Sequence, residues 1–204
     1  MNLATWLAVL SICALGAMSP GPSLAVVLRH TLSGGPRNGC VTAITHGAGI
    51  GLYALLCISG LAFIVSASPL LFRVFEWIGA AYLAWLGVQG LMAKRAAEDT
   101  EPPATATRSA ARDGFLIVFF NPKIAVFFIA LFSQVIGPDT SLYARYAYAA
   151  TAWLVDTAWY LLVAWLFSTP RWLPGLRHNS VWFERLFGLI LLALAARLVM
   201  ETIA

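Results

Sequence analysis

Six long runs of apolar residues, separated by short polar stretches, dominate this chain of 204 residues. Each run is about as long as the roughly 20 residues that an α-helix needs to cross the hydrocarbon core of a bilayer. Because backbone polar groups find no partner in lipid, each run has to form a helix. The sequence therefore predicts an all-α integral membrane protein with six transmembrane helices, at residues 3–28, 40–66, 69–92, 114–136, 146–168 and 182–200.

The composition excludes several other classes of protein. Hydrophobic residues make up 60% of the chain and charged residues only 11%, with a mean hydropathy of +0.80. A soluble domain carries roughly 25% charged residues, so a soluble enzyme and a nucleic-acid-binding protein are both poor interpretations. The three cysteines form no C-x-x-C pair and no cluster with histidine, and we expect neither a metal site nor a bound cofactor.

The positive charges predict how the chain is oriented in the membrane. Nine of the 13 Lys and Arg residues lie in the loops after the first, third and fifth predicted helices, or just beside them, and only three lie on the opposite side. Loops rich in Lys and Arg stay in the cytoplasm. We therefore expect both termini to face the outside of the cell, and we interpret the net charge of +4 as a signal of orientation.

The two halves of the chain resemble each other faintly. A polar stretch at 93–113, which we interpret as a cytoplasmic linker, separates residues 1–92 from residues 114–204. Ser19-Pro20 in the first half corresponds to Asn121-Pro122 in the second, and Phe75-Glu76 corresponds to Phe183-Glu184. With three helices in each half, the two repeats would insert in opposite directions. The prediction is one transporter domain built from two inverted repeats.

Proline motifs interrupt the first and fourth predicted helices. The first carries Ser-Pro-Gly-Pro at 19–22 and the fourth carries Asn-Pro-Lys at 121–123. A proline removes a backbone N–H and clashes with the preceding turn, so each helix should break there. The freed polar groups need protein or a polar cavity around them. A structural kink without a ligand is the alternative for each motif, and Lys123 could instead extend to the cytoplasmic surface.

Asp156 is the most informative single residue, because it lies near the middle of the fifth predicted helix. Carboxylates at that depth are costly and usually face the interior, where they bind substrate or relay protons. We hypothesise that Asp156 couples transport to protons, with a buried structural pair to Lys123 as the alternative. His46 is a further candidate, although it could equally hydrogen-bond a neighbouring carbonyl group, and Gly47 and Gly51 beside it predict close helix packing.

These motifs resemble those of the LysE/RhtB amino-acid exporters. The resemblance rests on residues 19–22, on the glycine-containing turn at 34–39, on the stretch 79–87, on residues 121–123 and on Asp156. It implies a secondary carrier of the bacterial inner membrane that exports small amino acids or derivatives, of the homoserine, homoserine lactone, threonine, leucine or lysine type. It leaves open a monomer or a homodimer. The residues expected to line the path are Ser19, Pro20, Gly21, Pro22, Asn121, Pro122, Lys123 and Asp156.

Three other functions compete with this interpretation. An intramembrane hydrolase could pair Ser19 or Ser23 with His46, but a single asymmetric site does not account for two similar halves. A divalent-metal exporter would need several clustered His, Cys, Asp or Glu side chains within the membrane. An uncoupled, channel-like bundle is the third alternative. Counterflow with a panel of amino acids would separate a carrier from a channel.

Overall fold

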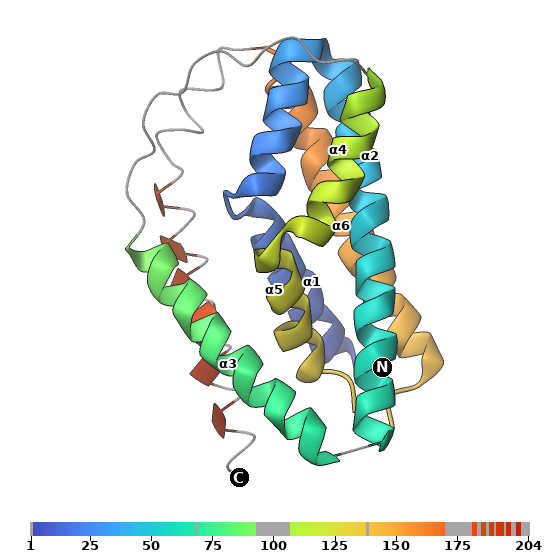
Figure 1. Cartoon of the computed structure of the whole chain (residues 1–204), viewed down its shortest axis with the longest axis vertical. Coiled ribbons are helices and arrows are strands. Elements are labelled where there is room, and N and C mark those ends of the chain that lie inside the picture. The colour runs from blue at the N-terminus through green and yellow to red at the C-terminus, as the bar shows by residue number, and fades with distance from the viewer. Residues whose placement is uncertain are drawn as a thin grey trace.

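The computed structural model describes residues 2–67, 69–92, 107–137 and 139–169, together with short helical pieces between 181 and 200. All regular structure in these residues is helical, which confirms the predicted class (Figure 1). Most of the predicted linker, residues 93–106, lies outside the described residues, as do residues 170–180 and parts of the sixth predicted helix. The helices are α1 (Leu3–Met18), α2 (Pro22–Ala67), α3 (Pro69–Leu91), α4 (Thr107–Phe120), α5 (Pro122–Ser133) and α6 (Leu142–Leu166).

Helix α2 is two helical arms joined at a sharp turn. Gly35 has φ 76° and ψ 177°, a backbone conformation that residues other than glycine rarely adopt, and Pro36 follows it. The chain reverses its direction there (Figure 1). We call residues 22–34 the first arm and residues 36–67 the second arm. The first arm extends beyond residue 28, where the sequence predicted a loop, so that Arg29 and His30 lie on a helix.

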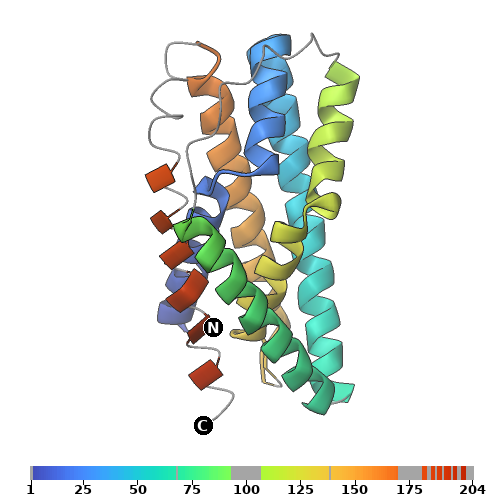
Figure 2. The ribbon, with the colours of Figure 1, turned by 60° about the vertical axis from the view of Figure 1, so that its left-hand side comes forward.

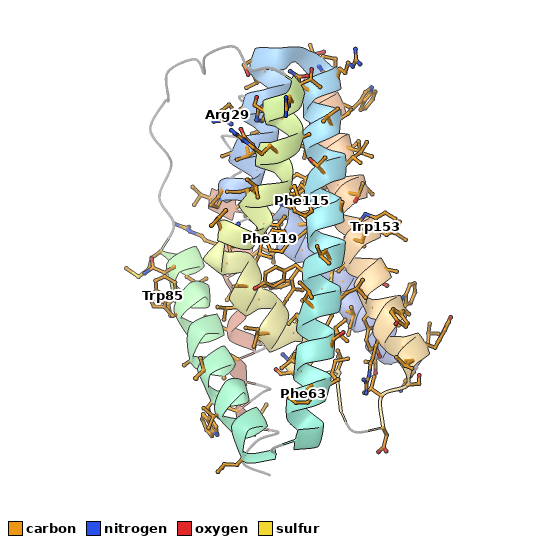
Figure 3. All side chains as sticks on the ribbon, turned by 45° about the vertical axis from the view of Figure 1, so that its right-hand side comes forward. Arg29, Phe63, Trp85, Phe115, Phe119 and Trp153 are labelled. Atoms are coloured by element: carbon orange, nitrogen blue, oxygen red, sulfur yellow. The ribbon has the colours of Figure 1, made fainter. Side chains whose placement is uncertain are left out.

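Several helices have the length and the apolar surface that a bilayer requires. By length and composition, two of the described helices qualify: α6, and α2 over residues 22–63, a stretch that includes both arms. Helices α4 and α5 are bent by 57° and make a third candidate if the pair is one span. Large apolar side chains cover the outside of the bundle, among them Trp85 and Trp153, which are 52% and 45% exposed (Figure 3). Such a surface suits contact with lipid chains.

The second arm of α2 lies between α4 and α6, and glycines permit the close approach. A Cβ atom at Gly47 would collide with the hydroxyl of Thr157 on α6, and one at Gly51 would lie 3.2 Å from Cγ of Trp153. The packing role predicted for these two glycines is confirmed. Small residues let helices pack through backbone contact, which matters in lipid because no hydrophobic force drives helices together.

The apolar core lies between α1, the second arm, α5 and α6. Its best-buried members include Val9, Ile58, Leu131 and Phe132. Helix α3 runs along the outside of this core, over α5 (Figure 2), and its Gly87 packs against Gly188 and Leu192 in the C-terminal pieces. The two proline motifs therefore adjoin helices that pack into this core, since α1 ends at Met18 and α5 begins at Pro122.

Candidate functional site

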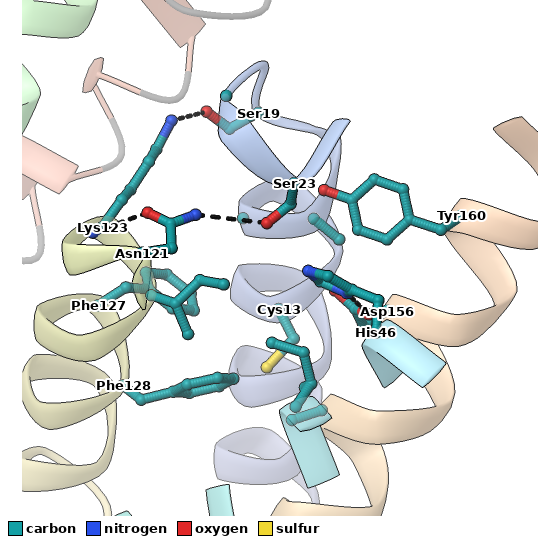
Figure 4. A pocket seen from close by; sticks show the side chains of 16 residues that line it. Cys13, Ser19, Ser23, His46, Asn121, Lys123, Phe127, Phe128, Asp156 and Tyr160 are labelled. Carbon is teal, nitrogen blue, oxygen red and sulfur yellow. Dashed lines mark hydrogen bonds and ion pairs between the residues drawn. The ribbon is translucent and has the colours of Figure 1, made fainter. Parts of the chain in front are cut away.

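The two proline motifs break their helices and meet each other in the middle of the bundle. Helix α1 ends at Met18 and α2 begins at Pro22, while α4 ends at Phe120 and α5 begins at Pro122. Nζ of Lys123 donates hydrogen bonds to Oγ of Ser19 (2.6 Å) and to the carbonyl oxygen of Pro20 (3.0 Å). The proline motifs of the two halves are thus joined directly (Figure 4).

Local chemistry explains why both helices stop and restart at these positions. The side chain of Asn121 caps the N-terminus of α5, where its Oδ1 accepts a hydrogen bond from the backbone N–H of Lys123 (3.0 Å). Proline suits the first position of a helix because its missing N–H would be unpaired there. Nδ2 of Asn121 donates to Oγ of Ser23 (3.3 Å) in the first arm. One side chain therefore starts a helix and links it to the other break.

His46 and Asp156 form a second polar pair nearby. Nδ1 of His46, on the second arm, lies 2.7 Å from Oδ2 of Asp156 on α6, and the two side chains are 1% and 10% exposed. Tyr160 lies one turn beyond Asp156 and packs edge-on against the imidazole, with ring centroids 4.8 Å apart. The hydroxyl group of Tyr160 points toward Ser23 (Figure 4). This pair is held by contacts on several sides.

A cavity lies between the helix breaks and the His46–Asp156 pair. It offers about 60 Å³ to water-sized groups, which corresponds to roughly four to six such groups. Lys123 lies on one side of it and Asp156 on the other, while Cys13, Phe127 and Phe128 line its apolar part (Figure 4). A cation, a carboxylate and an apolar wall around one small space can hold a small zwitterion.

Comparison with known proteins agrees with this arrangement. The family model described as LysE type translocator matches residues 14–202. The chain belongs to the LysE family. Members of this family are transporters, so the protein is not an enzyme. No solved structure matches the chain.

Several relatives of this LysE translocator have names that describe efflux. It is 26% identical over 189 residues to a threonine efflux protein of Salmonella typhi, covering 90% of this chain and 92% of the relative. It is 31% identical over 147 residues to a homoserine/homoserine lactone efflux protein of Salmonella typhimurium, covering 72% and 71% of the two chains. It is also 24% identical over 197 residues to the Bacillus subtilis membrane protein YrhP, covering 91% and 93%.

The structure of the translocator brings most of the predicted site residues together. Lys123 faces inward and lines the cavity instead of extending to the surface. The alternative pairing of Lys123 with Asp156 is wrong, since the ion-pair partner of Asp156 is His46. Pro20 contributes its carbonyl group, and Pro22 and Pro122 begin helices. The predicted residues that line the cavity are Ser19, Gly21, His46, Asn121, Lys123 and Asp156.

The hydrolase alternative has no support in this geometry. The hydroxyl of Ser19 accepts a hydrogen bond from Lys123, and that of Ser23 accepts one from Asn121. Nε2 of His46 is buried and has no hydrogen-bond partner among the described residues. A serine nucleophile needs the base within hydrogen-bond reach, and neither serine is bonded to this imidazole.

Sequence reasoning missed several residues of the cavity wall. Tyr160 follows Asp156 by four residues and Phe127 follows Lys123 by four residues. Residues at this spacing lie on the same face of a helix, so the helical period was a usable signal for both. Nothing in the local sequence marked Cys13, which reaches the cavity because α1 packs against α6.

Proposed function

We propose that this LysE translocator is a secondary-active exporter in the bacterial inner membrane. Its substrate is a small amino acid or a derivative, of the homoserine, homoserine lactone, threonine, leucine or lysine type. The observation that carries the proposal is the cavity that contains Lys123 and Asp156 at the junction of two broken helices. Substrate sites of transporters lie at such breaks, because freed backbone groups there can bind ions and polar ligands.

The charges of the cavity suggest how an amino acid is held. Its carboxylate interacts with Lys123, whose ammonium group already reaches the break between α1 and α2. Its ammonium group interacts with Asp156 on the other side of the cavity. These two contacts take the place of the water around the charged groups of the substrate. They therefore offset the free-energy cost of transferring those charged groups from solvent into the cavity.

We infer that the two halves move relative to each other around this site. In Figure 1, α1 and the first arm run from bottom to top, whereas α4 and α5 run from top to bottom. Inverted repeats place corresponding broken helices in opposite directions. Transporters built from such repeats move by rocking one half against the other. In this arrangement α1 with the first arm forms the first of six spans, and α4 with α5 forms the fourth.

The orientation proposed from the charges is compatible with the fold. Arg37 follows the Gly35 turn, and Thr107 at the start of α4 donates a hydrogen bond to Asn38 (2.7 Å), so both segments lie at one end of the bundle. Arg29 lies near that end as well (Figure 3). We propose that this basic end faces the cytoplasm, with both termini of the chain on the periplasmic side.

Proton coupling is the part of the proposal that depends most on Asp156. Its carboxylate and the imidazole of His46 are the adjacent groups that can exchange a proton next to the cavity. Export driven by a pH gradient in inverted vesicles tests this role, with Asp156→Asn as the variant. Loss of gradient-driven export is expected, and a variant that still exports like the wild type would contradict the coupling role.

Counterflow in proteoliposomes tests the transport function itself. Vesicles loaded with unlabelled threonine should accumulate labelled threonine transiently when no ion gradient is present, because a carrier exchanges one substrate molecule for another. A channel-like bundle gives simple equilibration without this overshoot. A divalent-metal exporter gives no response to any amino acid of the panel. Either result would refute the proposed function.

A further inference from the structure

The lower part of the cavity is apolar and contains a ring that is held in place. Phe127, on α5, is 8% exposed and lines the cavity (Figure 4). Its ring centroid is 5.4 Å from that of Phe128, which in turn stacks on Phe132 at 5.3 Å. Because Phe128 and Phe132 are also buried, the ring of Phe127 has little room to move away from the cavity.

Gly16 of α1 lies directly against this ring. A Cβ atom at Gly16 would lie 2.8 Å from Cζ of Phe127 and 3.3 Å from its Cε1 and Cε2 atoms. A contact of 2.8 Å between carbon atoms is well inside their optimal separation of about 3.5–4.0 Å. The absence of a side chain at this position therefore lets the ring lie against the backbone of α1.

The remaining space restricts the size of a bound molecule. About 60 Å³ is available to water-sized groups, roughly the room of four to six of them, so a long or aromatic side chain has little space beside the bound ammonium and carboxylate groups. The charged side chains that the structure describes on the cavity wall are Lys123 and Asp156, with His46 beside them. The zwitterion would occupy both, so a charge on the substrate side chain would face the apolar wall without a partner.

We propose that Phe127, seated on Gly16, is the specificity-determining side chain of this transporter. It limits the substrate to neutral amino acids with short side chains and excludes those with long, aromatic or charged side chains. This inference rests on the proposed function and narrows the substrates named there, since it excludes the lysine type. The two residues act together: the ring forms the end of the cavity, and the glycine sets how far the ring lies from the helix breaks.

Competition in the threonine counterflow assay measures this selectivity. For the wild type, alanine, serine and homoserine should compete with labelled threonine, and phenylalanine and lysine should not. Phe127→Ala should increase competition by phenylalanine relative to serine about tenfold or more, the range that small changes in an apolar pocket produce. Phe127→Leu, which retains apolar packing, should give an intermediate ratio. Lysine should stay excluded in both variants, because neither adds a carboxylate.

Two variants serve as matched controls. Phe120→Ala removes a phenylalanine that is 76% exposed on α4, and its selectivity should equal that of the wild type. Gly60→Ala is the control for Gly16→Ala, because a Cβ at Gly60 meets nothing within 4 Å, and it should leave selectivity unchanged. Gly16→Ala itself should force the ring toward the helix breaks and weaken the binding of threonine relative to that of alanine.

The possible failures can be told apart. If wild-type vesicles exchange no amino acid, the proposed function fails and the selectivity role fails with it. If threonine is exchanged but the phenylalanine-to-serine ratio is unchanged in Phe127→Ala and Phe127→Leu, the function stands and the role of Phe127 is refuted. Equal shifts in Phe120→Ala, or loss of all exchange in both folded Phe127 variants, would also overturn that role.

Discussion

Replacing Lys123 by methionine removes the positive charge from the cavity while keeping a side chain of similar length. In the proposed pose this ammonium group binds the substrate carboxylate, and a hydrogen bond to a charged group contributes about 1.5–3 kcal/mol. Since about 1.4 kcal/mol corresponds to a factor of ten, the threonine concentration that half-saturates counterflow should rise about ten- to hundredfold. The maximal rate should change less than the half-saturating concentration.

The control for this prediction is Arg108→Met, which removes a positive charge from an exposed position on α4 and should leave half-saturation unchanged. Lys123→Met also leaves the Ser19 hydroxyl and the Pro20 carbonyl oxygen without the bonds they receive now. Its folded fraction therefore has to be measured by size-exclusion chromatography. A folded Lys123→Met protein with the wild-type half-saturating concentration would refute the contact between this residue and the substrate.

Two further predictions concern the packing of the helices. Gly47→Ala places a methyl group against Thr157 on α6 and should destabilise the protein by about 1–3 kcal/mol. Thermal unfolding in detergent, monitored by tryptophan fluorescence, should give this variant a lower Tm than that of Gly60→Ala. Equal Tm values would contradict the close contact. Asp113→Asn removes the ion pair of Asp113 with Arg29 (2.5 Å) and changes its contact with buried His30 (3.1 Å), both of which join α4 to the first arm. Because Arg29 is 42% exposed, its pair should contribute only about 1 kcal/mol, and a Tm equal to that of the wild type would show that the two contacts together contribute nothing.

The helix breaks could be predicted from the sequence because proline acts locally. Ser-Pro-Gly-Pro and Asn-Pro-Lys remove backbone donors wherever the surrounding helix packs, so their effect does not depend on the rest of the fold. The inward position of Lys123 was one of two open alternatives. Which alternative holds depends on the break between α1 and α2, because that break supplies the oxygen atoms to which the ammonium group of Lys123 donates hydrogen bonds.

The partner of Asp156 could not be predicted in the same way. Depth in the membrane indicated that this carboxylate faces the protein interior, and Lys123 was the one partner that the sequence suggested, whereas His46 was expected to bond a neighbouring carbonyl group or to take part in transport. The choice depends on how the second arm packs against α6, where Gly47 brings His46 close to Asp156. Six spans, inverted repeats and the location of the termini stay predictions, since parts of the sixth predicted helix lie outside the described residues.

The central claim is that a small amino acid crosses the membrane through the cavity between the two helix breaks. Threonine counterflow by Asp156→Asn, measured beside Asp139→Asn at equal reconstitution, tests it most directly. Asp139 lies exposed before α6, away from the cavity, so its variant should exchange threonine at the wild-type rate. Asp156→Asn keeps the size of the side chain but loses the charge that binds the ammonium group, and its rate should fall about tenfold or more. Equal rates for the two variants would contradict the claim.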